Sequence, residues 1–211
     1  MARTRSENYD GIYLGILTNA AALFSAQGYM RSSIADLADA CKLSRGALYY
    51  YFDSKEAILF AILDAHIHEM IQRVEAAVSE GGPTLTQFRN VIRTIVDVNA
   101  KSPNEQRVLI HDLSFLNDDE QQTIKNMERQ LVDTVTDLLV RLDAEGKVVK
   151  RTRKIYTMIL FGIINYTYTW YDPKGGISPR EFADMAVDVF LNGFATVDAG
   201  KPVPASRRER V

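Results

Sequence analysis

Hydrophobic residues recur every three or four positions along most of the chain, and this spacing is typical of amphipathic helices. The first segment shows it at Ile12, Ile16, Ala20, Leu23 and Phe24, which predicts a helix over about residues 10–27. Gly28 follows directly, where many helices end on a residue in the left-handed conformation. No stretch alternates strictly between apolar and polar residues, as a half-buried strand would. The pattern therefore predicts an all-α fold.

Two short helices and one long helix are expected next. Ser33 and Ser44 should each begin a short helix, because a serine side chain accepts hydrogen bonds from the free N–H groups at a helix start. The predicted inner face of the first short helix consists of Ile34, Leu37, Ala38 and Cys41. Residues 53–56 have the acid-x-x-Glu form of a capping box, with Asp53 as the cap, and predict the start of a long helix. The Glu-Gly-Gly-Pro run at 80–83 should end it.

The second half of the chain repeats these start signals. Capping patterns stand at residues 102–105, 117–120 and 178–181, and further helical spacing covers residues 85–99 and 152–171. Together the segments predict roughly nine helices.

Composition narrows the functional classes. With 46% hydrophobic residues and a formal net charge of -2, the chain is neither globally disordered nor polybasic, so a nucleic-acid role must rest on a local site. The single cysteine excludes an internal disulfide framework and fits a reducing compartment. We expect Cys41 to lie in the core. The first residues show no signal-peptide pattern, and the apolar run at 158–164 is too short to cross a bilayer, so we expect a cytoplasmic protein.

Three N-terminal helices, with a short connection between the second and third, are typical of a helix-turn-helix DNA-binding unit. If Leu48, Tyr51 and Phe52 pack inward, the opposite face of the third helix carries Arg45, Gly46, Ala47, Tyr49 and Tyr50. Arginine can bind guanine in the major groove, alanine can contact a thymine methyl group, and tyrosine hydroxyls can bind phosphates or base edges.

Four more residues stand near predicted helix starts, where backbone N–H groups and positive charge favour phosphate. They are Arg31, Ser33, Ser44 and Lys55. In the alternative interpretation, the tyrosines form a hydrophobic core while Arg45 and Lys55 are solvated charges. The spacing alone leaves both interpretations open.

The segments Ser33–Ala38, Leu43–Phe52 and Ser54–Ala57 closely resemble the DNA-binding signature of TetR-type regulators. The resemblance covers about residues 9–63. It implies that Ser44, Arg45, Gly46, Ala47, Tyr49, Tyr50 and Lys55 contact DNA. It also implies a homodimeric repressor on a palindromic operator that a small molecule releases. The chain departs from the family at Lys42, where a glycine is frequent; a left-handed lysine costs about 1 kcal/mol more than glycine.

The resemblance divides the chain into a DNA-binding domain at 1–55, an effector-binding and dimerisation domain at 56–199, and a tail at 200–211 that we expect to fray. The helix predicted at 152–171 is apolar all round at 158–164, so neighbours must cover every side. With the last helix it could form a four-helix bundle across a two-fold axis. The residues expected in this interface are Gly162, Phe182, Met185, Val189 and Phe190. In the alternative, both helices only complete the core of a monomer.

Residues 165–179 resemble a branch of the family whose members often respond to acyl-coenzyme A thioesters. This second resemblance implies that Asn165, Tyr166 and Trp170 lie near the effector. The residues expected to line the same pocket are Phe88, Ile92, Val96 and His111, and those expected to meet coenzyme phosphates are Arg89, Arg93 and Arg107. In the alternative, the aromatic residues belong to the core and the arginines are solvated.

Nothing in the sequence indicates catalysis. His66 and His68 stand two residues apart, on different helix faces, and no set of ligands has the spacing of a metal site. We therefore expect no enzyme, no metal and no cofactor. Two rivals to the repressor remain: a nucleoid-associated protein of the same fold that acts through a protein partner, and an all-α scaffold with no DNA role.

Overall fold

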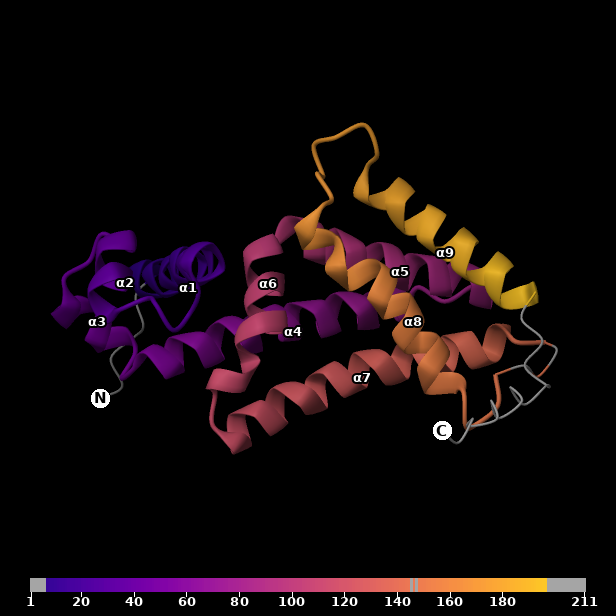
Figure 1. The fold of residues 1–211 in the computed structure, drawn as a ribbon, viewed down its shortest axis with the longest axis horizontal. Helices are drawn as coiled ribbons and strands as arrows, with labels where there is room; N and C mark the ends of the chain where they lie inside the picture. The colour runs from indigo at the N-terminus through magenta and orange to yellow at the C-terminus, as the bar shows by residue number, and fades with distance from the viewer. Residues whose placement is uncertain (1–6, 145, 147, 197–211) are drawn as a thin grey trace, which may run out of the picture.

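The computed structural model describes residues 7–144, 146 and 148–196, and these residues form helices joined by short loops without a strand (Figure 1). The predicted all-α fold is confirmed. Three helices form a cluster at one end: α1 (Glu7–Gln27), α2 (Ile34–Ala40) and α3 (Arg45–Tyr51). The predicted tail at 200–211 lies outside the described residues.

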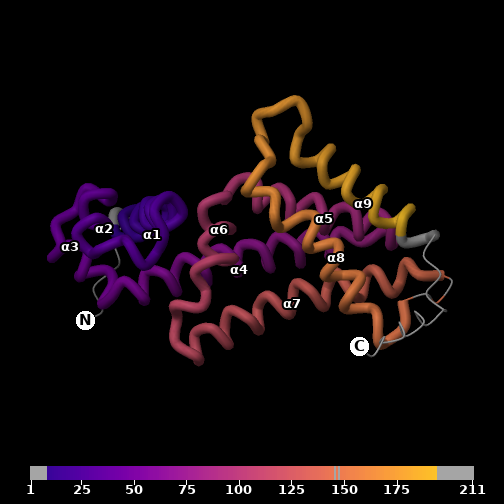
Figure 2. The backbone as a smooth tube through the Cα atoms, viewed as in Figure 1, coloured from indigo at the N-terminus to yellow at the C-terminus, as the bar shows by residue number. Residues whose placement is uncertain are grey.

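The long helix α4 (Lys55–Ser79) leaves this N-terminal cluster and runs into the body of the molecule (Figure 1). The body contains α5 (Thr84–Lys101), α6 (Pro103–Asp112), a 3-10 turn η1 (Leu113–Phe115), α7 (Asp118–Leu142), α8 (Arg153–Asn165), a second 3-10 turn η2 (Tyr166–Thr169) and α9 (Pro179–Thr196). The described part of the chain therefore holds nine α-helices, as the sequence predicts. In the backbone trace of Figure 2, α4 and α7 run side by side through the body, where they pack against each other.

Most helix starts follow the predicted caps. The Ser33 and Asn117 side chains form capping boxes with Asp36 and Glu120. Ser178 does the same with Glu181: the Ser178 hydroxyl accepts a hydrogen bond of 3.2 Å from the Glu181 amide. Each box satisfies backbone donors that a helix start would otherwise leave free.

Two predicted caps are wrong in detail. Helix α4 is capped by Ser54 rather than Asp53, because the Ser54 hydroxyl is the group that accepts a hydrogen bond from the Ala57 amide. Ser102 precedes α6 but makes no side-chain cap, since the same residue also ends α5 with the backbone angles φ −125° and ψ 56°.

Other local expectations are confirmed or corrected by the backbone. Gly28 and Lys42 both have positive φ, 89° and 55°, so this chain does place a left-handed lysine in the turn before α3. The helix predicted at 152–171 is shorter, because α8 ends at Asn165 and the chain tightens into η2. Cys41 is only half-buried, because it forms the C-cap of α2, and burial raises the pKa of its thiol.

The core joins the two parts of the molecule through α4. The buried residues of α4 run from Ile58 near the N-terminal cluster to Ala77 in the body. Helix α1 packs against both α4 and α6. A displacement of α4 or α6 in the body would therefore act directly on the N-terminal cluster.

Candidate nucleic-acid interface and effector cavity

Helix α3 presents a free polar and aromatic face beside a buried apolar one. Leu48 and Phe52 are buried, and Tyr51 packs on Tyr9 with ring centroids 4.8 Å apart. On the opposite face, Tyr49 and Tyr50 keep 50% and 68% of their surface exposed. Tyr51 thus belongs to the core side, whereas Tyr49 and Tyr50 are accessible to a ligand.

Arg45 and Gly46 lie at the exposed start of α3, and Ala47 beside them is half-buried. The Arg45 guanidinium makes no hydrogen bond or ion pair with the residues that the structure describes. The Ser44 hydroxyl accepts a hydrogen bond from the Ala47 amide at 3.1 Å. The five expected base-reading residues therefore lie along one short helix, where four are exposed and Ala47 is half-buried.

The residues expected to bind phosphate around α2 are exposed but already make internal contacts. Arg31 donates through Nε to the Gln27 carbonyl oxygen at 2.7 Å. The Ser33 hydroxyl donates to Asp36 at 2.7 Å within the capping box.

Lys55 makes an internal contact that the sequence did not indicate. Its Nζ donates to the carbonyl oxygens of Tyr29 and Ser32, each at 3.1 Å, and lies 4.1 Å from the centroid of the Tyr29 ring. The ammonium therefore holds the loop between α1 and α2 against the start of α4.

Tyr29 also connects the N-terminal cluster to the body. Its hydroxyl donates to Glu56 at 2.9 Å, and its ring stacks on Phe115 of η1 with centroids 5.2 Å apart. Burial and the hydrogen bond to Glu56 raise the pKa of Tyr29 well above its usual range. In turn, a backbone hydrogen bond and the Tyr29 hydroxyl lower the pKa of the Glu56 carboxyl.

The body contains a partly open cavity of about 360 Å³, within the size range of small-molecule sites. Five helices line it, α4 to α8. The lining residues are His66, Ile67, Met70, Ile95, Asn99, Gln106, Leu109, Lys125, Glu128, Arg129, Leu131, Val132, Lys154, Met158, Phe161 and Asn165. Sequence reasoning found only Asn165 among them, because the rest are scattered over residues 66–161 with no local motif.

One part of the cavity wall is formed by buried neutral polar groups. Nε2 of His66 lies 3.2 Å from Oε1 of Gln106, and burial lowers the pKa of the imidazole. Asn99 donates to Asn165 Oδ1 over a long 3.4 Å, and Asn99 Oδ1 has no partner among the described residues. An unpaired buried oxygen is uncommon in a folded protein.

Another part of the wall is charged. Lys125, Arg129 and Lys154 are exposed there, and the half-buried Glu128 stands among them. Burial raises the pKa of the Glu128 carboxyl, while the neighbouring Lys125 opposes this effect.

Most of the residues expected near the effector lie elsewhere. Phe88, Ile92 and Val96 are fully buried on another face of α5 and belong to the packed core. Tyr166 and Trp170 are exposed outside the cavity. Arg107 and His111 line a smaller hollow of about 160 Å³ beside Arg31, between the end of α1 and α6.

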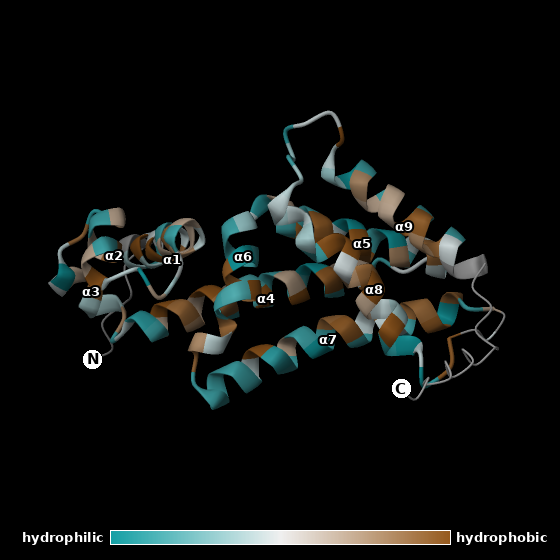
Figure 3. Cartoon of the chain, in the orientation of Figure 1, coloured by the Kyte–Doolittle hydropathy of each residue, from teal (hydrophilic) through white to brown (hydrophobic). Residues whose placement is uncertain are grey.

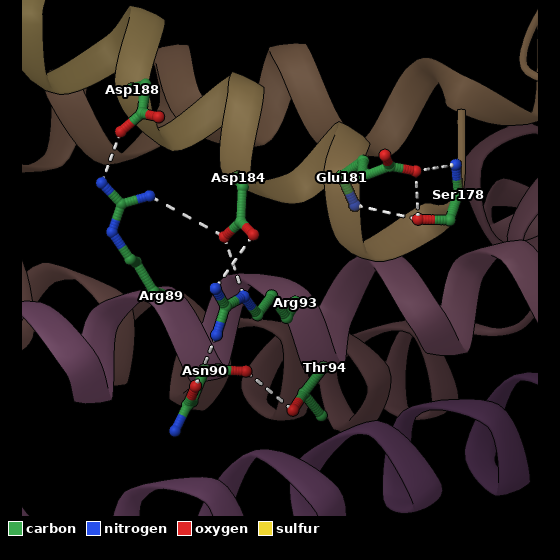
Figure 4. Close-up of polar contacts among 8 residues, drawn as sticks. All are labelled: Arg89, Asn90, Arg93, Thr94, Ser178, Glu181, Asp184 and Asp188. Carbon is green, nitrogen blue, oxygen red and sulfur yellow. Dashed lines mark hydrogen bonds and ion pairs between the residues drawn. The ribbon is translucent and has the colours of Figure 1, made fainter. Parts of the chain in front are cut away.

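Arg93 and Arg89 are occupied by carboxylates of α9 (Figure 4). Arg93 binds Asp184 through two hydrogen bonds of 2.8 and 2.9 Å, and Arg89 pairs with Asp188. These contacts hold α5 to α9, and they explain why neither guanidinium faces the cavity. They also lower the pKa of the Asp184 carboxyl, chiefly through the Arg93 hydrogen bonds.

Helices α8 and α9 both carry exposed apolar side chains, and parts of both ribbons are coloured as hydrophobic in Figure 3. These side chains include Ile155, Ile159, Met185 and Val189. Gly162 is also exposed, and a Cβ added there would meet no atom within 4 Å. Phe182 is half-buried under Trp170 and Tyr171. Phe190 is only 6% exposed, so this residue faces the core of its own chain and not a partner.

The described residues contain no group of three His, Cys, Asp or Glu side chains that could hold a metal ion. Among the same residues, no helix has the length and apolar character needed to cross a membrane.

The two parts of the molecule match two family models. Residues 16–62 match the model of bacterial regulatory proteins of the tetR family, and residues 81–194 match that of the tetracyclin repressor-like C-terminal domain. The chain belongs to the TetR family. It is therefore a TetR-family transcriptional regulator with an N-terminal helix-turn-helix and a helical C-terminal ligand-binding domain.

Solved TetR-family structures share this fold. A TetR-family transcriptional regulator from Bordetella parapertussis is 33% identical, with a TM-score of 0.85 over 90% of this chain and 98% of that chain. AibR, solved in complex with isovaleryl coenzyme A and operator DNA, is 22% identical, with a TM-score of 0.72 over 85% of this chain and 98% of that chain. At that identity, AibR supports the TetR fold alone.

Two curated relatives match over part of their length. The helix-turn-helix-type regulator YuxN of Bacillus subtilis is 32% identical over 39% of this chain and 28% of its own. Nucleoid occlusion factor SlmA of Haemophilus influenzae is 28% identical over 63% of this chain and 56% of its own. The matches span less than two thirds of either relative.

Proposed function

We propose that this TetR-family regulator is a cytoplasmic repressor that binds a palindromic operator as a homodimer and is released by a small molecule in the cavity. The exposed face of α3 carries the DNA-binding part of this proposal. There, Arg45, Tyr49 and Tyr50 are accessible while Leu48 anchors the helix in the core. Arginine and tyrosine on the outward face of a helix that fits the major groove can contact both base edges and phosphates.

The exposed apolar surface of α8 and α9 supports the dimer. Large exposed apolar patches on a monomer usually mark interaction sites. Met185 and Val189 stand four residues apart, on one face of α9, and Ile155 and Ile159 do the same on α8. A two-fold axis through this surface would join two helices from each chain in a four-helix bundle and present two copies of α3 to successive major grooves, about 34 Å apart.

Release of the protein from DNA would act through α4 and α6, because both helices line the cavity and contact the N-terminal cluster. Helix α4 lines the cavity through His66 and Met70, and its first residue, Lys55, holds the loop after α1. Helix α6 lines the cavity through Gln106 and packs against α1. A ligand that moves either helix changes the spacing of the two DNA-binding ends. For a tenfold loss of DNA affinity, the ligand must favour the released state by about 1.4 kcal/mol, and DNA must weaken ligand binding equally.

An acyl-coenzyme A thioester is the effector class that we propose first. AibR, of the same fold, has been solved with isovaleryl coenzyme A. In this chain, Lys125, Arg129 and Lys154 offer positive charge to an anionic ligand beside the apolar cavity wall. Of the three arginines expected from the sequence to meet the coenzyme, Arg89 and Arg93 are occupied by Asp188 and Asp184, and Arg107 lines a different hollow.

The direct test is to sequence the DNA fragments that the purified full-length protein selects from a random pool. We expect an inverted repeat, bound by a dimer in a gel-shift assay, and at least one acyl-coenzyme A ester should dissociate this complex. If no sequence is enriched, the repressor proposal fails. If another small molecule dissociates the complex and no thioester does, only the effector class is wrong.

The similarity to nucleoid occlusion factor SlmA supports a second candidate, a nucleoid-associated DNA-binding protein that acts through a protein partner. Genome-wide mapping of bound DNA separates the two. A few promoter palindromes favour the repressor, whereas many sites dispersed along the chromosome favour the nucleoid-associated protein. Absence of bound sites would favour a scaffold with no DNA role.

A further inference from the structure

One face of α8 spans the cavity from the charged part of its wall to the neutral polar part. Lys154, Met158, Phe161 and Asn165 all line the cavity, and they follow one another at steps of four, three and four residues. This spacing places them on a single helical stripe. Eleven residues separate Lys154 from Asn165, or about 16 Å along the helix axis. The cavity wall is therefore charged at the Lys154 end of α8 and neutral and polar at the Asn165 end.

The end at Asn165 lacks one hydrogen bond. Asn99 is 3% exposed, and its Oδ1 has no partner among the described residues, while its Nδ2 reaches Asn165 Oδ1 only at 3.4 Å. The nearby His66 and Gln106 pair with each other, and burial lowers the pKa of His66, which keeps its imidazole neutral. A ligand group that fits here is neutral and forms hydrogen bonds. A hydroxyl can both donate to an amide oxygen and accept from an amide nitrogen.

The end at Lys154 favours a negative charge. Lys125 and Arg129 bond only to the neutral side chains of Gln121 and Asn126, and no described carboxylate pairs with either residue or with Lys154. Glu128 is the acidic residue of the cavity lining, so the lining carries two net positive charges when Lys125, Arg129, Lys154 and Glu128 are all ionised. Between the ends, Met70, Ile95 and Phe161 supply an apolar wall.

We propose that the cavity selects an elongated amphiphile with an anionic group at the Lys154 end, an apolar middle, and a hydroxyl that completes the hydrogen bonding of Asn99. This inference rests on the proposed effector role of the cavity. It adds to that role the chemistry of the ligand's two ends and the length of the ligand. The anion is a carboxylate or a phosphate, and both satisfy the same cations.

The test uses 12-hydroxydodecanoate and the full-length protein in titration calorimetry. Dodecanoate lacks the hydroxyl, and 1,12-dodecanediol lacks the anion. We expect each to bind about tenfold more weakly or worse, because each leaves one end of the cavity unsatisfied. The coenzyme A thioester of 12-hydroxydodecanoate shows which anion the cations prefer. If the thioester binds more tightly than the free acid, the anion is a phosphate. If the free acid binds more tightly, the anion is a carboxylate. Equal affinity for all three simple compounds would overturn the proposal.

Substitutions test the contribution of each end of the cavity to ligand binding. Asn99→Leu should remove the preference for 12-hydroxydodecanoate over dodecanoate, because the amide that the hydroxyl meets is gone. Lys154→Gln, at an exposed position, should weaken both acids and leave the diol unchanged. Lys150→Gln, also exposed but outside the cavity lining, is the matched control and should bind like the wild type. If Lys154→Gln and Lys150→Gln behave alike, the charged end plays no part and the proposal fails.

Operator binding measured on the same preparations distinguishes a failure of the repressor proposal from a failure of the ligand inference. Discrimination between the compounds without DNA binding would refute the repressor and leave the ligand inference standing. Operator binding without discrimination would overturn the ligand inference alone.

Discussion

The ammonium of Lys55 donates a hydrogen bond to the carbonyl oxygen of Tyr29 at 3.1 Å and lies 4.1 Å from the centroid of the Tyr29 ring. The next residue, Glu56, accepts the Tyr29 hydroxyl at 2.9 Å. The first two residues of α4 therefore hold Tyr29 at its backbone and at its hydroxyl. Since α4 continues into the cavity wall, this contact transmits a movement of α4 to the DNA-binding end.

We expect Lys55→Met to lower stability by about 1–2 kcal/mol, because it removes two charged hydrogen bonds and the contact of a cation with an aromatic ring. Urea unfolding measures the change. The control is Lys42→Met, at an exposed position, which should stay within about 0.5 kcal/mol of the wild type. If Lys55→Met is as stable as the wild type but its slope of log affinity against log salt falls by about one unit, Lys55 acts as a phosphate ligand instead.

Arg45→Ala and Tyr49→Ala should each weaken operator binding by about 1–3 kcal/mol while leaving the melting temperature unchanged. Both side chains are exposed on α3, so they contribute little to the core. Fluorescence anisotropy with operator and with random DNA measures the loss and its specificity. Gln122→Ala, exposed on α7 in the body, is the control and should bind as the wild type does. Unchanged affinity in both α3 variants would contradict the assignment of α3 as the recognition helix.

The sequence predicted the helices well because their signals are local. The spacing of Ile12 and Ile16 or the capping box of Ser178 with Glu181 involves residues only three or four positions apart. The left-handed backbone of Lys42 was expected from the glycine that TetR-type sequences often have at this position, and the φ of 55° confirms it. The helix start at Ser54 was misassigned because Asp53 and Ser54 are both good caps, and only the structure decides between adjacent candidates.

The cavity that we propose as the effector site could not be predicted in the same way, because its lining residues meet only in three dimensions. Asn99 and Asn165 are 66 residues apart, and no spacing rule connects them. Arg93 looked like a solvated or ligand-binding arginine until the fold placed Asp184 beside it, 91 residues further along. The resemblance of residues 165–179 to one branch of the family implied that Tyr166 and Trp170 lie near the effector, yet both side chains are exposed outside the cavity.

The Arg93–Asp184 pair should make stability depend on acid pH. Its hydrogen bonds lower the folded-state pKa of Asp184 from the model-compound value of 3.8. The stabilisation is therefore fully present above pH 3.8, and it is lost as the pH falls through the lowered value and Asp184 becomes protonated. Urea unfolding of the wild type and of Asp184→Asn should show a gap in stability at neutral pH that closes in strong acid. A constant gap across this range would contradict the assignment.

Val189→Glu should convert the protein into a folded monomer. Val189 is 70% exposed, so a carboxylate is solvated in the monomer but would be buried in the proposed dimer at a high cost. Sedimentation velocity should show loss of the dimer, with unchanged helical content by circular dichroism. Phe190→Glu provides the contrast: this residue is 6% exposed, and the same change should unfold the domain. A wild-type monomer at micromolar concentration would contradict the dimer proposal.

The sole tryptophan should report on assembly and not on effector binding. Trp170 is 62% exposed and lies outside the cavity, in a shallow hollow with Phe182, Met185 and Val189 at the α8–α9 surface. Because the proposed dimer covers this surface, dissociation should expose the indole to water and shift its emission to longer wavelength. Dilution of the wild type should reproduce the spectrum of Val189→Glu, and an effector added to that monomeric variant should leave the emission almost unchanged. A large spectral change on effector binding, with the same state of assembly, would place Trp170 in contact with the ligand and contradict this assignment.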